Sequence, residues 1–189
     1  MKRFYLVLFL LCLFFVSCGE TEVSFEFEVK NREVTITKMK GRSKSITVPS
    51  TINGMPVVEF YSNYYLFQDK GIEKITLPNT LTSLGSLSDN KLTTLTIPNS
   101  VKVISQGALR NNKLTSITIP EGCEIRTGAF EDNQLTSVNL PNSLREIEMF
   151  VFKNNKLTSI TIPSRVKKIQ GGAFKKIRLP VLQYLIMCI

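Results

Sequence analysis

Apolar residues recur at fixed positions along most of this chain, with a period of 21 to 22 residues. The repeated stretch has the form Leu-x-x-Ile-x-Ile-Pro, in which apolar and polar residues alternate before the proline. Four copies show it most clearly: Lys91–Pro98, Lys113–Pro120, Gln134–Pro141 and Lys156–Pro163, after a shorter copy around 75–78. Self-similarity at this period predicts a solenoid, in which each copy forms one coil that packs against the next.

The alternation within a copy predicts one short strand. In the third copy, Ile117 and Ile119 should point inward while Ser116 and Thr118 face solvent. Pro120 ends the strand because proline has no N–H to donate. The pattern matches the strand of a leucine-rich repeat. The predicted fold class is therefore a β-rich solenoid of leucine-rich repeats of about 22 residues, with one short parallel strand per coil and an N-terminal β cap.

Other positions of the repeat have structural explanations. Cys123 falls at an inward position and is predicted to be a small buried hydrophobe rather than a reactive thiol. Phe130, Phe152 and Phe174 share one position and predict a core spine. Each copy ends in an Asn or Asp pair, suited to turning the chain and bonding between coils. The pairs are Asp89-Asn90, Asn111-Asn112, Asp132-Asn133 and Asn154-Asn155. Only two of them contain an acid, which favours a structural role over calcium binding.

The segment before the repeats has a different pattern. Alternating stretches at 23–29 and 33–37 predict two strands, and 40–43 predicts a turn before the next strand at 46–49. A solenoid needs an atypical first unit to cover the open end of its core. We assign residues 18–69 to an N-terminal cap with an irregular first unit, and residues 70–174 to the leucine-rich repeats.

The first residues resemble a secretory signal. Lys2 and Arg3 precede thirteen apolar residues and a small-residue site, and this apolar run is shorter than the roughly 20 residues that a membrane span needs. Phe15-Val-Ser-Cys18 is similar to a bacterial lipobox, which makes residues 1–17 a lipoprotein-type signal peptide and Cys18 the lipidated residue. Ordinary cleavage after Gly19 is the alternative. Either way the protein is expected to be exported, and with lipid it would sit at the cell surface or outer membrane.

Composition removes several classes of function. The chain has no histidine, so a Ser-His-Asp triad, a His-containing zinc site and an imidazole base are impossible. No phosphate-binding loop, metal-ligand spacing or nucleophile elbow is present. We therefore expect no enzyme, no cofactor and no metal, and the cysteines left after signal removal do not form a disulfide framework.

The net charge of +9 does not indicate a nucleic-acid partner. Two cations lie in the first three residues and seven between Lys156 and Arg178, where the chain has no acid. The remainder carries 15 basic and 15 acidic residues. A nearly neutral body does not favour binding to a polyanion.

The last fifteen residues depart from the repeat. Reading the back-translated tail in another frame, with A at the free codon positions, gives Lys-Asn-Lys-Ile-Thr-Ser-Ile-Thr, which is the missing next strand. We interpret residues 175–189 as a divergent, frameshifted tail. Such a tail would leave the last coil with an open core face and an unpaired strand edge.

The aligned copies resemble the BspA-like leucine-rich repeat family of bacterial surface proteins. Strand, proline and Gly-Ala-Phe recur in register, the last at 128–130 and 172–174, and 46–58 is similar to how those proteins begin. The resemblance covers roughly residues 30–175; Met149-Phe150-Val151 departs from it. It implies a surface-exposed domain associated with adhesion to host matrix proteins and to other bacteria.

Function is expected from the exposed strand positions. We predict a non-catalytic protein-binding or adhesion module whose partner-binding sheet face consists of Thr94, Thr96, Ser116, Thr118, Ser137, Asn139, Ser159 and Thr161. Hydroxyls and amides can hydrogen-bond, but the face has no aromatic anchor, so one copy should bind modestly. Thr and Ser are also ordinary β-formers on a solvated face. A structural envelope lipoprotein, or a truncated fragment of a longer adhesin, remains the alternative.

Lipidation of Cys18 is testable by labelling. The wild-type chain should incorporate a radioactive fatty acid and partition into detergent, because an acyl chain adds apolar surface. Cys18→Ala should abolish the label and leave the chain released or unprocessed. Unchanged labelling of that variant would contradict the lipoprotein assignment.

Overall fold

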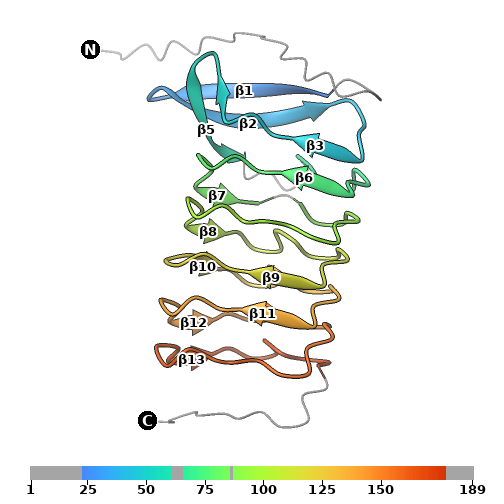
Figure 1. Ribbon diagram of the computed structural model, residues 1–189, viewed down its shortest axis with the longest axis vertical. Coiled ribbons are helices and arrows are strands. Elements are labelled where there is room, and N and C mark those ends of the chain that lie inside the picture. The colour runs from blue at the N-terminus through green and yellow to red at the C-terminus, as the bar shows by residue number, and fades with distance from the viewer. Residues whose placement is uncertain (1–22, 61–65, 86, 178–189) are drawn as a thin grey trace, which may run out of the picture.

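The computed structural model describes residues 23–60, 66–85 and 87–177. Within this part the chain forms thirteen short strands and no helix, so it contains no helix that could cross a membrane. Successive coils stack into a column from the N-terminal strands to β13 (Figure 1). This confirms the β-solenoid. The predicted signal peptide, Cys18 and the tail beyond residue 177 lie outside the described residues.

The N-terminal cap is a four-stranded sheet in the order β1-β2-β5-β4. Its strands are β1 (Ser24–Lys30), β2 (Glu33–Lys40), β4 (Thr51–Ile52) and β5 (Met55–Phe60). β1 and β2 form an antiparallel hairpin, and Asn31 and Arg32 take positive φ angles of 54° and 65° in its turn. Phe60 packs edge-on against Phe67, with ring centroids 5.0 Å apart, so the cap closes the top of the core.

Five coils of the repeat follow the cap. We number them 1 to 5, and they span residues 71–90, 91–112, 113–133, 134–155 and 156–177. Coil 3 has 21 residues, whereas coils 2, 4 and 5 have 22.

One side of the column, here the strand face, carries the strands predicted from the sequence. They are β3 (Ser45–Thr47), β6 (Lys74–Thr76), β9 (Ser116–Thr118) and β11 (Ser137–Asn139). β3 pairs with β6 and β9 pairs with β11, all in parallel. Ile117 and Ile119 are each 3% exposed and Thr118 is exposed, which confirms the predicted register.

The predicted strand of the strand face is absent from coils 2 and 5, where residues 94–97 and 159–162 form no strand. The opposite side, here the second face, carries a strand in each coil. These strands are β7 (Ser83–Leu84), β8 (Val103–Ile104), β10 (Glu124–Ile125), β12 (Glu146–Ile147) and β13 (Lys168–Ile169). The sequence predicted one strand per coil and missed this one. This second strand follows a turn at the proline. In the turn the N–H of Val101 donates to the carbonyl of Pro98 at 3.0 Å, and the same bond recurs in the other coils. After the turn the chain is extended again, with its apolar residues pointing inward.

A ladder of buried asparagines joins the coils at one corner. Asn90, Asn112, Asn133 and Asn155 are 5–7% exposed. The Oδ1 of Asn133 accepts the N–H of Leu114 at 3.1 Å, at the start of its own coil. Its Nδ2 donates to the carbonyl of Leu109 in the preceding coil at 2.8 Å. Each amide thus closes one coil and ties it to the one before, which confirms the structural role of the pairs.

The residue before each asparagine takes the left-handed conformation. Asp89, Asn111, Asp132 and Asn154 have φ angles between 52° and 58°. Asp and Asn tolerate this region better than other side chains with a Cβ. Coil 5 has Ile177 where the other coils have the buried asparagine, so none of the described residues supplies an amide that closes it.

Stacked aromatic rings run through the lower core. Phe130 and Phe152 lie with centroids 5.8 Å apart, and Phe152 and Phe174 with centroids 5.7 Å apart, both nearly parallel. This confirms the predicted spine. In coil 5, Val166, Ile169 and Phe174 are only partly buried, although their counterparts in the earlier coils are buried.

The asparagine ladder yields a stability prediction. Asn133→Ala leaves the N–H of Leu114 without its partner, and an unpaired buried group costs about 1–3 kcal/mol. The carbonyl of Leu109 loses one donor but keeps Nδ2 of Asn112 at 3.2 Å. We expect the free energy of unfolding in urea to fall by about 1–3 kcal/mol. Asn142→Ala is the control, because Asn142 is exposed, and it should change stability by less than about 0.5 kcal/mol. Equal effects of the two substitutions would contradict the assigned role.

Candidate binding surface on the strand face

The eight predicted binding residues form two columns on the strand face. Thr94, Ser116, Ser137 and Ser159 make the first column, and Thr96, Thr118, Asn139 and Thr161 make the second. All eight are exposed. Between the columns the side chains of Leu95, Ile117, Val138 and Ile160 turn inward to the core. Successive side chains of the strand therefore point alternately to solvent and to the core, so that the binding residues and the core residues are different residues.

Most of these polar groups are available to a partner. Nδ2 of Asn139 donates to Oγ1 of Thr118 at 3.2 Å. For the other six residues, no side-chain hydrogen bond is formed within the described part of the chain. Their hydroxyls can each donate and accept a bond to a ligand.

The face is hollowed between coils 2 and 3. Residues 94–97 have the strand sequence but form no strand, and no backbone bond joins 95–97 to 117–119. The two coils separate there around a groove of about 360 Å³. Thr94, Thr96, Ser116 and Thr118 line it, above the apolar residues Ile97 and Ile117. Sequence reasoning found these four residues but not the groove between them, because every copy carries the same pattern.

A row of lysines borders this face. Lys91, Lys113 and Lys156 occupy the first position of their coils and are exposed. Coils 2 to 5 have no acidic residue between this position and the proline. The nearest acid in the coil above, Glu73, has its pKa lowered first by the hydrogen bond from Lys44, whose ammonium lies 3.0 Å away, and also by the charges of Lys44, Lys91 and Lys113. The lysines therefore give one border of the face a row of positive charge, which suits an acidic partner.

Cys123 lies on the other side of the column. It is 3% exposed, and burial raises the pKa of its thiol to about 11. The thiolate is the nucleophilic form, so this cysteine is unreactive at neutral pH. The prediction of a buried hydrophobe is confirmed. Within the described residues no group of three or more Cys, Asp or Glu side chains is placed to hold a metal ion.

Comparison with known proteins relates this repeat to a described family. The profile of the BspA type leucine-rich repeat region matches residues 61–179 in six copies. A search of curated proteins gives no match.

Several solved structures share the fold. A leucine-rich repeat protein from Bacteroides ovatus aligns at 21% identity with a TM-score of 0.60, over 81% of this chain and 49% of that one. The pneumococcal vaccine antigen PcpA aligns at 20% identity with a TM-score of 0.65, over 87% and 48%. The leucine-rich repeat protein TpLRR from T. pallidum aligns at 19% identity with a TM-score of 0.53, over 78% of this chain and 79% of that one. The chain spans about half the length of the first two.

The buried thiol gives a prediction that tests the packing of the core on the second face. At about pH 8, a thiol with a pKa near 11 is thiolate in roughly one molecule in a thousand, against roughly a quarter for a free cysteine. Iodoacetamide should label Cys123 about 100-fold more slowly in the folded chain than in concentrated urea. Mass spectrometry of the Cys123 peptide measures both rates. Equal rates would show that this position is open to solvent.

Proposed function

The chain belongs to the BspA-type leucine-rich repeat proteins, and from this premise we propose that it is a non-catalytic, surface-displayed module that binds partner proteins through its strand face. The two columns of exposed hydroxyl and amide groups carry the proposal. They keep register over four coils, and four of their members line the groove between coils 2 and 3. Stacked repeats commonly present such extended surfaces to partners.

The chemistry of the face defines the partner. Side chains that donate and accept hydrogen bonds in regular rows suit a partner with a polar surface. The row formed by Lys91, Lys113 and Lys156 favours a partner whose surface is acidic. No aromatic residue stands among the eight binding positions, so a single domain should bind modestly and gain strength by multivalent display. Host matrix proteins and surface proteins of other bacteria are the partner classes that we propose.

Display at the cell surface supports this function. The lipobox-like sequence at 15–18 would anchor the mature chain through Cys18, and family membership favours a surface location. A lipid anchor would hold the repeats close to the membrane surface and raise the number of copies that can engage one partner.

The proposal is tested by measuring binding to immobilised matrix proteins such as laminin, collagen and fibronectin. Thr118→Glu adds a negative charge at the groove and should weaken binding about tenfold, which corresponds to about 1.4 kcal/mol. Gln106→Glu adds the same charge at an exposed position outside the strand face and should leave binding unchanged. Binding should also weaken as salt rises.

The opposite results favour a different role. If no matrix protein binds, or if Thr118→Glu and Gln106→Glu weaken binding equally, then the strand face is not the contact surface. The structural role, in an envelope lipoprotein or a fragment of a longer adhesin, would then be the better explanation. Thermal unfolding of both variants shows that they keep the fold.

A further inference from the structure

The backbone ladder of the second face is broken between coils 3 and 4. At the other junctions two bonds recur, as in coil 5, where the N–H groups of Lys167 and Gln170 donate to the carbonyls of Arg145 and Ile147 at 2.8 Å. The corresponding N–H groups of coils 2 and 3 donate equivalent bonds to carbonyls of the coil before. Between coils 3 and 4 neither bond forms, and β10 does not pair with β12.

Side chains replace the missing bonds at the two ends of this break. The carboxylate of Glu148 accepts the N–H of Thr127 at 2.7 Å and its hydroxyl at 2.8 Å. The carboxylate of Glu121 accepts the N–H groups of Asn142 and Ser143 at 2.8 and 3.1 Å. These bonds, first that from Asn142, lower the pKa of Glu121. The break is therefore bounded by specific contacts, which hold the two coils together on either side of it.

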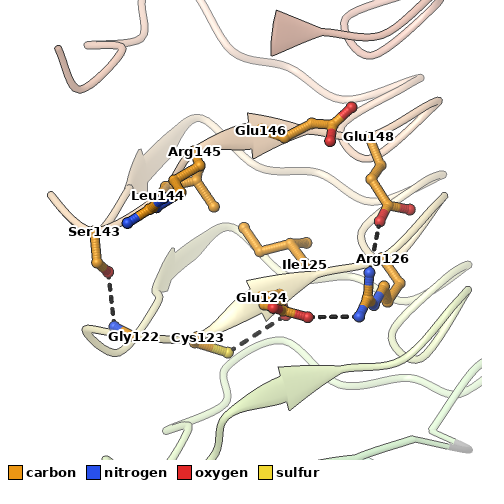
Figure 2. A pocket seen from close by; sticks show the side chains of 10 residues that line it. All are labelled: Gly122, Cys123, Glu124, Ile125, Arg126, Ser143, Leu144, Arg145, Glu146 and Glu148. Carbon is orange, nitrogen blue, oxygen red and sulfur yellow. Dashed lines mark hydrogen bonds and ion pairs between the residues drawn. The ribbon is translucent and has the colours of Figure 1, made fainter. Parts of the chain in front are cut away.

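The break encloses a hollow of about 330 Å³ (Figure 2). Its walls come from residues 122–126 of coil 3 and from 143–146 and Glu148 of coil 4. Figure 2 shows Arg126 between Glu124 and Glu148, to which it donates at 2.5 and 3.2 Å. Arg145 has no ion pair or side-chain hydrogen bond with any described residue, so it is the cation left free at this hollow.

The hollow also leaves backbone groups that form no hydrogen bond with the residues that the structure describes. They are the counterparts of the groups that bond between coils 4 and 5: the N–H groups of Arg145 and Glu148 and the carbonyl of Ile125. Two donors and one acceptor along the edges of two strands match the groups that another strand would offer.

Coil 4 also carries two apolar residues, Met149 and Phe150, next in sequence after Glu148 at one end of the hollow. Met149 follows Glu148 and is 41% exposed, and its carbonyl accepts the N–H of Gly128 where the ladder resumes. Phe150 has a φ of 60°, at the position that Gly107, Gly128 and Gly172 hold in the other coils. A phenylalanine in this conformation costs about 1–3 kcal/mol, and such strain concentrates where a protein binds.

Contacts hold the Phe150 ring in place. It lies over Gly172 of coil 5 so closely that a Cβ added to that glycine would be 2.4 Å from a ring carbon. The ammonium of Lys153 is 5.1 Å from the ring centroid. An ordered aromatic ring beside a flexible methionine is a suitable anchor for an apolar side chain.

We propose that the break between β10 and β12 is the docking site of an extended segment of a partner protein. Its backbone would pair with the free groups of Ile125, Arg145 and Glu148, an acidic side chain would face the Arg145 guanidinium, and an apolar side chain would pack on Met149 and Phe150. This deepens the proposed protein-binding function, on which it rests, by adding a second contact surface and the conformation of the segment that it takes.

The first test follows hydrogen exchange in the full chain. Unpaired amides exchange faster than ladder amides. The amides of Arg145 and Glu148 should therefore exchange at least about tenfold faster than those of Lys167 and Gln170, their equivalents in coil 5. Equal protection of the two pairs would mean that the ladder is closed, and would overturn the proposal.

The second test uses a random peptide library displayed on phage and selected on the full chain. Selected peptides should combine an acidic and an apolar residue, protect the amides of Arg145 and Glu148, and lose about tenfold in affinity when their backbone is N-methylated. Arg145→Glu should weaken them about tenfold, whereas Lys167→Glu, at the equivalent position of coil 5, should not.

Other outcomes separate this proposal from the strand-face function. Peptides that bind without protecting these amides, or no selected peptide at all, would overturn the docking site. Thr118→Glu should leave peptide binding unchanged, because Thr118 lies on the opposite face. If Thr118→Glu abolishes it, the peptides bind the strand face, which would support that function and reject this site.

Discussion

The buried asparagine amide at the end of each coil is the interaction on which the solenoid depends. The strands are two or three residues long in the repeats, too short to hold a sheet together by themselves. A coil corner has backbone groups that no regular element satisfies, and burying them unpaired would cost several kcal/mol. One side chain with both a donor and an acceptor meets this need, because its oxygen closes its own coil while its nitrogen reaches the coil before.

Coil 3 pairs with a different neighbour on each face. It pairs with coil 4 on the strand face through β9 and β11, but with coil 2 on the second face through β10 and β8. It is open to coil 2 on the strand face and to coil 4 on the second face. The groove and the break between β10 and β12 thus both border coil 3, one on each of its faces.

Sequence reasoning reached the parts of the structure that are set within one repeat. Alternation placed Ile117 inside and Thr118 outside, the proline ended the strand, and the shared position of Phe130 and Phe152 predicted their stacking. The second strand was missed because its two residues are too few to show a period. The groove and the break were missed for a deeper reason: they depend on which neighbouring copies pair on each face, while the sequence pattern of each copy is nearly the same. The length of coil 3 and the phenylalanine at a glycine position were the available signals.

The division between core and surface explains how such a chain can bind without losing stability. Because inward and outward residues alternate, the groups offered to a partner on the strand face contribute little to the core, and a polar substitution there costs little. The second face works differently, since Glu121 and Glu148 both hold coils 3 and 4 together and border the hollow. A partner segment that completes the ladder would add backbone bonds across the least paired junction of the second face. Binding there would therefore stabilise the stack itself, so that occupancy of the site and cohesion of coils 3 and 4 are thermodynamically linked.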